Sequence, residues 1–414
     1  MNYLQTSIRI FIFICFVLQS NRLFSTDLIV APGGTGGSYA TLGAAIAAAS
    51  AGDRIIVYPQ PNNAAYSETA LTITKSLQIL SANEGAFYTI DAPSITITPA
   101  TANATITIIG MKLLTGGIAT GAASPAGART NINLMNDSIK VGAVSITHDN
   151  YNLTAAANYI DNGVTFKYGK LLGNAISSIV TVNNDASTNN VGDTTLIIGN
   201  RINFYTSVNT GGINWNSTSQ FFNFQNNFII ASYPSSNTNV GIIVNTSRAG
   251  NAATNLILNN TICKITYSLY GAMSVALNAT ASVDVLNNLV IAPLYAYGIG
   301  LGTGNANAHY NYCTSFSGFT NDGTNVSPTN TTLNTTTGAI TNPLSNAING
   351  GTPDSAYADI DLTRNDAGCY GGSYTQDNFF PITANDWARV ILVTAPRRVM
   401  VNSTINVQAI GFDK

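Results

Sequence analysis

The chain has 414 residues, a formal net charge of −2 and only 9% charged residues, where ordinary soluble proteins have roughly 25%. So few charges exclude a charge-solvated disordered protein and give no electrostatic reason to expect nucleic acid or an anionic membrane as a partner. The 45% of hydrophobic residues are spread among Ala, Val and Ile, so we expect no membrane span once the N-terminal segment is removed.

The first predicted element is a targeting segment. Arg9 precedes the nine-residue apolar run 10–18, and polar residues follow that run. A basic residue ahead of an apolar run too short to cross a bilayer is typical of a secretory signal peptide, here residues 1–25. We therefore expect a secreted or cell-surface protein.

Three cysteines remain after this segment, Cys263, Cys313 and Cys369. An odd number in an exported protein permits one disulfide and one free thiol. The other interpretation, which we favour, is that all three are small core residues.

A strand at 27–31 and a Gly-rich turn precede a short helix within residues 38–51. One face of this helix is apolar: Leu42, Ala45, Ile46 and Ala49. Ser38 or Thr41 can cap its N-terminus, and Gly52 can end it. A strand at 53–59 then opens a long series of short strands with alternating apolar residues, each ended by Asn or Gly.

These strands form a repeat. Its most regular markers, spaced by 27, 33, 28 and 23 residues, are Asn200, Asn227, Asn260, Asn288 and Asn311. Each Asn is followed by a strand, a bend, a second strand, a loop and a third strand. Three strands and three bends per unit predict one coil of a parallel β-helix, with coils about 4.8 Å apart. We expect each Asn to adopt a left-handed turn conformation and to pair its amide with the coils above and below.

The stretch "SYATLGAAIAAASAGDRIIVYP…YSETALTITKSLQIL" resembles the opening of bacterial secreted proteins of the pectin-lyase-like superfamily, and "DLTRNDAGCYGG" (361–372) is similar to a segment that often finishes them. The resemblance covers roughly residues 27–375. It implies an all-β, right-handed, single-stranded parallel β-helix whose N-terminal end is closed by a capping helix. The expected domains are the β-helix, 26–375, with a loop-rich part at 314–375, and a tail at 376–414.

The tail breaks the repeat. It contains two strand-like runs around Arg397-Arg398. We predict a short β cap that covers the open edge of the last coil, with a partner-docking segment as the alternative.

Enzymes of the superfamily act on acidic polysaccharides and carry paired carboxylates, or Asp-bound calcium with a basic residue. The residues here that could support such chemistry are His309, Lys264, Asp284 and Arg201. His309 could act as a base, but a histidine bonded to a neighbouring loop explains it better. Lys264 with Asp284 is equally well an ordinary surface ion pair, and Arg201 occupies a different column of the repeat.

Tyrosines recur at one position of the repeat. Tyr267 and Tyr295 each lie seven residues after their Asn, Tyr270 and Tyr297 lie beside the following Gly, and Tyr310 extends the series. Such a column predicts a surface on which sugar rings can stack. The alternative is that the rings cover the bend and pack on one another.

The region 314–362 is rich in Asn, Thr and Gly, and Asp354, Asp359, Asp361 and Asp366 fall in it or just after it. Their spacing matches no compact calcium loop, so we expect no cofactor and keep Ca²⁺ as an alternative.

We therefore predict a non-catalytic exported scaffold with possible carbohydrate binding on an outer face. A lyase or glycoside hydrolase acting on an acidic polysaccharide is the main alternative, and a structural unit whose tail docks a partner is the third.

Overall fold

The computed structural model describes residues 25–83, 85–125, 129–187, 191–205, 211–231, 240–249, 255–264, 272–291, 298–302, 304–379, 389–395 and 404–412. The predicted signal peptide, residues 1–25, lies outside these ranges except for Ser25. No helix within them has both the length and the apolar character needed to cross a membrane.

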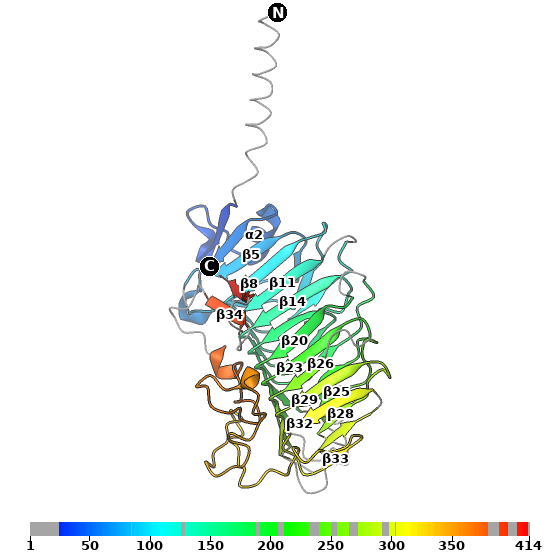
Figure 1. Ribbon diagram of the computed structural model, residues 1–414. Coiled ribbons are helices and arrows are strands. Elements are labelled where there is room, and N and C mark those ends of the chain that lie inside the picture. The colour runs from blue at the N-terminus through cyan, green and yellow to red at the C-terminus, as the bar shows by residue number, and fades with distance from the viewer. Residues whose placement is uncertain are drawn as a thin grey trace, which may run out of the picture.

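Three long parallel sheets make up the described chain (Figure 1). Sheet A has 12 strands: β1 (Asp27–Val30), β2 (Arg54–Val57), β5 (Leu77–Ser81), β8 (Thr105–Ile109), β11 (Thr130–Met135), β14 (Tyr151–Ala156), β17 (Gly169–Leu172), β20 (Thr194–Ile198), β23 (Phe221–Gln225), β26 (Asn255–Leu258), β29 (Ser282–Leu286) and β32 (Asn305–His309). Sheet B has 10 strands: β3 (Ala65–Ser67), β6 (Tyr88–Asp91), β9 (Met111–Leu113), β12 (Ser138–Ile139), β15 (Tyr159–Ile160), β18 (Ala175–Ile176), β21 (Arg201–Phe204), β24 (Phe228–Ala231), β27 (Thr261–Lys264) and β30 (Leu289–Ile291). Sheet C has 11 strands: β4 (Leu71–Ile73), β7 (Ser94–Ile97), β10 (Gly117–Thr120), β13 (Val144–Ser145), β16 (Val164–Phe166), β19 (Val180–Val182), β22 (Gly211–Trp215), β25 (Val240–Val244), β28 (Met273–Val275), β31 (Ile299–Leu301) and β33 (Phe316–Ser317).

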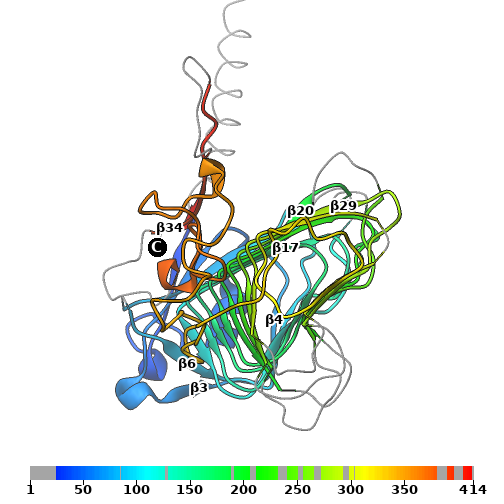
Figure 2. The ribbon, with the colours of Figure 1, turned by 60° about the horizontal axis from the view of Figure 1, so that its bottom comes forward.

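Each coil takes the chain through sheets A, B and C in turn, and each strand pairs in parallel with the strand one coil away. In sheet A, for example, β11 lies between β8 and β14. Figure 2 shows the stack turned toward its end, with the coils lying one behind another around a common interior. The predicted fold class, a right-handed parallel β-helix, is confirmed.

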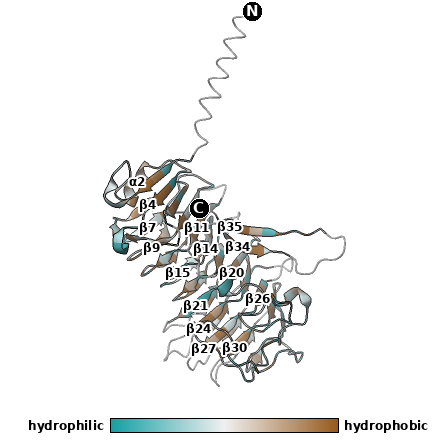
Figure 3. Cartoon of the chain, turned by 90° about the vertical axis from the view of Figure 1, so that its left-hand side faces the viewer, coloured by the Kyte–Doolittle hydropathy of each residue, from teal (hydrophilic) through white to brown (hydrophobic). Residues whose placement is uncertain are grey.

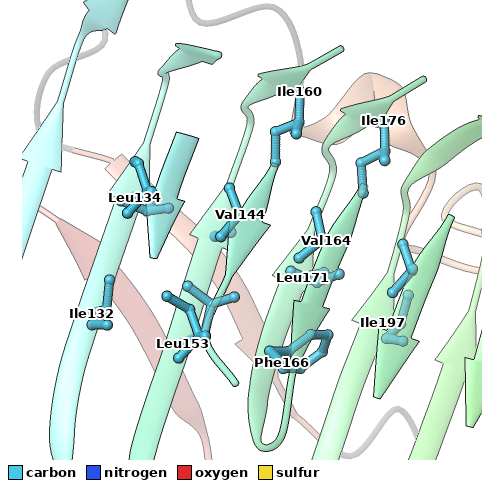
Figure 4. Packing of buried hydrophobic residues seen from close by; sticks show 14 of the residues in the cluster. Ile132, Leu134, Val144, Leu153, Ile160, Val164, Phe166, Leu171, Ile176 and Ile197 are labelled. Carbon is cyan, nitrogen blue, oxygen red and sulfur yellow. The ribbon is translucent and has the colours of Figure 1, made fainter. Parts of the chain in front are cut away.

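The interior is one continuous apolar core. Alternate residues of every strand point inward, as Ile132 and Leu134 do in sheet A and Val164 and Phe166 do in sheet C (Figure 4). Fully burying a side chain of this kind stabilises the fold by about 1.5–3 kcal/mol. One buried cluster runs from Leu28 to Cys313, so the coils of the stack share a single core.

Helix α2 (Leu42–Ala48), the α-helix of the described chain, closes the N-terminal end of this core. Leu42, Ala45 and Ile46 are buried in the core cluster. Thr41 Oγ1 accepts a hydrogen bond from Ala44 N at 3.2 Å, so Thr41 is the cap. The Glu68 carboxylate accepts the N–H of Leu42 at 2.5 Å, which satisfies a further donor of the first turn.

The Asn residues form a buried ladder at the bend between sheets A and B. Its rungs are Asn158, Asn174, Asn200, Asn227, Asn260, Asn288, Asn311 and Asn325. Each Nδ2 donates to the Oδ1 of the next rung at 2.8–3.0 Å. Each Oδ1 also accepts the backbone N–H of the rung before it, as Asn227 accepts from Asn200 at 3.0 Å. The side chains thus replace the backbone pairing that the bend interrupts.

The left-handed conformation lies one residue earlier than the sequence predicted. The backbone φ angle is positive at Asn226, Asn259 and Asn287, whereas the rungs that follow them are not left-handed. Gly173 and Gly199 occupy the same place in other coils. From the sequence we expected one Asn both to adopt the left-handed conformation and to pair its amide with the neighbouring coils. In the structure two adjacent residues share these roles, because the rung must point its amide inward while the preceding residue makes the sharp turn.

Asp137 occupies the first polar position of the ladder. It is fully buried, its Oδ1 accepts the N–H of Met111 at 2.8 Å, and its own N–H donates to Asn158 Oδ1 at 2.8 Å. Its Oδ2 has no partner and stands where the other rungs place a donating Nδ2. Burial raises the pKa of Asp137 well above its ordinary value, which favours the protonated carboxylic acid, the form that can donate through Oδ2.

The chain completes its last coil and then turns back. Val326 pairs with Tyr312, and Asn325 is the last rung of the ladder. Residues 327–379, which we call the strap, then run back along the outside of the bend between sheets A and B (Figure 1). The segment 361–372 therefore lies against the side of the stack and does not finish it.

The left-handed residues of the bend hold the strap. Asn226 Nδ2 donates to the carbonyl oxygens of Cys369 and Gly371. Asn259 Nδ2 donates to Asn365 Oδ1 at 2.9 Å, and Asn287 Oδ1 accepts the N–H of Thr352 at 2.8 Å. In the next two coils toward the N-terminus, glycines take this position, and the Phe379 ring packs against Gly199 and Gly173.

The three cysteines are buried and unpaired, as favoured from the sequence. Cys263 and Cys369 lie in one small apolar cluster between sheet B and the strap, and Cys313 lies in the main core. Burial raises the pKa of the Cys369 thiol to about 12, so it is held as an unreactive thiol.

The tail packs in a different place from the one predicted. Strands β34 (Arg389–Thr394) and β35 (Gln408–Phe412) form a two-stranded antiparallel sheet. Ile391 and Leu392 are buried against an outward column of sheet A that comprises Leu80, Ile109, Met135, Ala156, Leu172 and Ile198. The β cap thus covers the side of the early coils (Figure 3), because these coils present an apolar column there.

Four short 3-10 turns complete the described elements: η1 (Pro32–Gly34), η2 (Pro61–Asn63), η4 (Ser355–Tyr357) and η5 (Gln376–Asn378).

Replacing Asp137 by Asn should stabilise the protein in a pH-dependent way. The raised pKa in the folded state means that wild-type stability falls as pH rises from the ordinary carboxyl pKa near 4 toward the folded value, by about 1.4 kcal/mol per pH unit. The Asn side chain does not titrate, so it adds no pH dependence of this kind to the stability of the variant. We expect Asp137→Asn and wild type to unfold alike near pH 4 and the variant to be more stable at pH 8, measured by urea denaturation. A pH-independent difference would contradict a neutral Asp137.

Replacing Gly173 by Ala should loosen the strap. Ala157 already takes the left-handed conformation in this column, so the turn alone costs about 1–2 kcal/mol. A Cβ at Gly173 would also collide with Phe379, which adds about 1–3 kcal/mol. In a Phe379→Gly background, which also removes the Cβ that a residue at 173 would meet first, only the first cost should remain. A double-mutant cycle by urea denaturation measures the difference, and equal costs in both backgrounds would show that Phe379 does not pack there.

Candidate functional site

A cleft of about 340 Å³ lies between the strap and the outer end of sheet A. Its lining residues are Gln225, Asn226, Leu258, Asn259, Ala356, Tyr357, Gly372, Ser373, Tyr374 and Ala395. Of these described residues none is charged. The cleft is therefore a neutral site with amide, hydroxyl and aromatic groups on its walls.

Gln225 supplies an amide in a column that is otherwise apolar. It ends β23 and stands in register between Ile198 and Leu258. Gln225 is only 8% exposed, and no hydrogen bond joins its side-chain amide to another described residue. A largely buried amide without a protein partner lies ready to bond a ligand.

The strap places two tyrosines on the opposite wall. Asp354 accepts the N–H of Ala356 at 2.9 Å and so starts the turn η4, which ends at Tyr357. Asn365 Nδ2 holds the carbonyl of Tyr357 at 2.6 Å. The Tyr374 hydroxyl donates to the carbonyl of Val393 at 3.0 Å, which ties that ring to the tail.

The free polar groups of the cleft are few and come from different segments. Besides the Gln225 amide, they include the hydroxyls of Tyr357 and Ser373, which have no side-chain partner among the described residues, and Asn259 Oδ1, which has no hydrogen-bond partner there. Burial, followed by the negative charges of Asp284 and Asp354, raises the pKa of Tyr357. Its hydroxyl therefore remains protonated and can both donate and accept a hydrogen bond.

His309 and Asp284, two of the predicted catalytic candidates, lie in one polar cluster near the end of the stack. His309 Nδ1 is 2.8 Å from Asp322 Oδ2, and its Nε2 is 2.5 Å from Asn307 Oδ1. Asn307 Nδ2 donates to Asp284 Oδ1 at 3.2 Å. Because both ring nitrogens are engaged, the arrangement ties β32 to the following loop and leaves no nitrogen free to accept a proton from a substrate.

Arg201 and Lys264 do not join this cluster. They lie in β21 and β27 of sheet B, in different columns, since Arg201 is in register with Phe228 and Thr261. Only the backbone of Lys264 is described, so its pairing with Asp284 stays untested. Arg201, in sheet B, thus lies apart from His309 and Asp284, which are both in sheet A.

Of the predicted tyrosine column only Tyr310 belongs to the described residues; Tyr267, Tyr270, Tyr295 and Tyr297 lie outside them. Tyr310 takes the left-handed position of its coil, with a φ of 56°. The Arg364 guanidinium stands 5.8 Å from the centre of its ring. This contact joins the strap to the last coils. The sugar-stacking surface expected from the whole tyrosine column stays a prediction.

The acidic residues of the strap serve its own backbone. Asp359 accepts the N–H groups of Gly372 and Asp366 at 2.5 and 3.0 Å, and Asp366 accepts that of Asn349 at 2.6 Å. Burial raises the pKa of Asp359 to about 6. Within the described ranges no group of three or more His, Cys, Asp or Glu side chains is arranged to hold a metal ion.

Comparison with known proteins adds no relative. No family model, no curated protein and no solved structure matches the chain.

The sequence analysis did not predict this cleft. Gln225 does stand out as a polar residue where most coils have an apolar one, but only once the register of sheet A is known. Tyr357 and Ser373 follow the last coil and belong to no repeat. No local pattern places them opposite β23.

Replacing Asp322 by Asn should lower stability at neutral pH and not in strong acid. Hydrogen bonds from the Thr324 hydroxyl and N–H, followed by His309, lower the pKa of Asp322 to about 2 from an ordinary 3.8. A depressed folded pKa means that the ionised carboxylate stabilises the fold above pH 4 and that this contribution disappears as pH falls toward 2. We expect a lower Tm for Asp322→Asn at pH 7 and equal Tm values near pH 2. If the Tm of Asp322→Asn were still below that of wild type at pH 2, the lowered pKa of Asp322 would be disproved.

Proposed function

We propose that the protein is a non-catalytic exported β-helix that serves as a rigid scaffold and binds carbohydrate on an outer face. The observation that carries the proposal is the uncharged polar surface of an uninterrupted stack. On the outer face of sheet C, successive coils present Thr72, Thr96, Ala119, Ser145, Thr165 and Thr181 in register. Hydroxyl groups on a rigid surface match the hydrogen-bonding groups of a glycan without requiring charge.

The distribution of charge supports a non-catalytic role. Several ionisable side chains on the described coils pair with one another, as Arg54 does with Asp27 and Lys140 with Asp161. Catalysis of glycoside cleavage needs a carboxyl pair flanking one bond, or a free base. The His309 cluster offers the nearest approach to such a group, and both of its ring nitrogens are occupied.

Placement with the bacterial secreted branch of the pectin-lyase-like superfamily remains part of this proposal. It rests on the capping helix, the three-sheet coil and the opening and closing motifs of the sequence. Export, whether to the medium or to the cell surface, rests on the predicted signal peptide. The alternative function, cleavage of an acidic polysaccharide, is the one that the following experiment separates from binding.

The mature protein should be retarded in native gels that contain a neutral polysaccharide, such as soluble starch or hydroxyethyl cellulose, without cleaving it. Polygalacturonate serves as the acidic comparison, and reducing ends and unsaturated products are assayed in parallel. Retardation without products supports the proposal, because binding alone is expected. Products that disappear in His309→Ala would establish an enzyme instead, and absence of retardation in every gel would overturn carbohydrate binding.

A further inference from the structure

We propose that the cleft between the strap and sheet A binds one neutral sugar unit. This inference rests on the proposed function, since it assigns that function to a particular place. The walls come from three parts of the chain: the end of β23 and β26, the strap around Tyr357 and Ser373, and the tail at Ala395.

The size of the cleft limits the ligand. Its volume of about 340 Å³ lies at the lower end of the range of about 300–1,000 Å³ that small-molecule pockets span. A single ring with its hydroxyl groups fits this space, whereas a longer oligosaccharide would extend out of it. A terminal residue or a branch of a glycan is therefore the expected occupant.

The polar groups match a polyhydroxylated ring. The Gln225 amide offers one donor and one acceptor site from sheet A, and the Tyr357 and Ser373 hydroxyls offer both functions from the strap. Gln225 is 8% exposed as a residue, and neither of its amide atoms is among the fully buried atoms without a partner, so the hydrogen-bonding capacity of the amide is open to the cleft. Filling that capacity by a sugar hydroxyl contributes about 0.5–1.5 kcal/mol per hydrogen bond.

Aromatic and apolar groups supply the remaining contact. Tyr357 and Tyr374 present ring surface, and Leu258 and Ala356 present aliphatic surface. The C–H face of a sugar ring packs on such surfaces while its hydroxyls reach the polar groups. The Tyr374 ring is held by its bond to the carbonyl of Val393, so this wall is in place before a ligand binds.

The charges around the cleft favour a neutral sugar over an acidic one. No described lining residue is cationic, and the nearest charges that act on Tyr357 are the carboxylates of Asp284 and Asp354. A uronate carboxylate placed in the cleft would meet negative charge and no counter-ion. The same surroundings tolerate a hydroxyl or an acetamido group.

Saturation-transfer NMR on the full mature protein tests the assignment with three probes: D-glucose, N-acetyl-D-glucosamine and D-galacturonate. We expect a neutral sugar to receive saturation more strongly than galacturonate. Gln225→Ala and Tyr357→Phe should each weaken its binding by about 2- to 10-fold, the range that corresponds to one lost hydrogen bond. The matched controls are Gln78→Ala, on the exposed face of a distant coil of sheet A, and Tyr58→Phe, which is 44% exposed and outside the cleft.

Three results would overturn the inference: no transfer to either neutral sugar, equal transfer to wild type and both cleft variants, or stronger binding of galacturonate. The Tm of every variant is measured so that loss of binding is not loss of fold. If the cleft variants fail to weaken sugar binding while retardation by a neutral polysaccharide persists, the cleft is the wrong place and the proposed function stands. If the wild-type protein were not retarded by any polysaccharide, both the proposed function and the assignment of the cleft would be wrong.

Discussion

The fold depends on satisfying the backbone where sheet A bends into sheet B. A sharp bend in every coil removes ladder hydrogen bonds, and buried N–H and C=O groups left unpaired would each cost about 1–3 kcal/mol. From Asn158 to Asn325 one Asn per coil solves this, because its Oδ1 accepts from the coil before and its Nδ2 donates to the coil after. The solution works only if every coil places its Asn at the same height. The rungs therefore fix the register of all three sheets.

The same requirement explains the residues around the ladder. A rung that points inward forces the residue before it into the left-handed turn, and the side chain of that residue then faces outward. Where it is Asn, as at Asn226 and Asn259, it binds the backbone of the strap. Where it is Gly, as at Gly173, it makes room for Phe379. The column that shapes the bend thus also determines how the C-terminal part of the chain is attached.

The sequence was informative wherever structure is decided locally. Alternating apolar residues and the recurring Asn predicted the coils, because inward-facing side chains and rungs repeat in every turn of the stack. The sequence placed the left-handed turn one residue too late. Where two Asn residues are adjacent, such as Asn259-Asn260, the sequence does not reveal which one adopts the left-handed conformation and which one joins the ladder. The strap and the tail could not be placed. Asn226 bonds a residue 143 positions away, and nothing in a local pattern encodes such a contact.

The stacked geometry also constrains the chemistry that the surface can support. Equivalent positions on neighbouring coils lie about 4.8 Å apart, and two like charges at that distance repel by about 3 kcal/mol at an effective dielectric constant of 20. A column of such charges would oppose the stacking that holds the coils together. Uncharged hydroxyls and amides can repeat along a column without this penalty, as they do on sheet C and in the ladder. Hydrogen bonds and ring surfaces are the interactions that such a surface can offer to a ligand, and the cleft proposed as a sugar site lies where a non-repeating segment, the strap, meets the stack at Gln225.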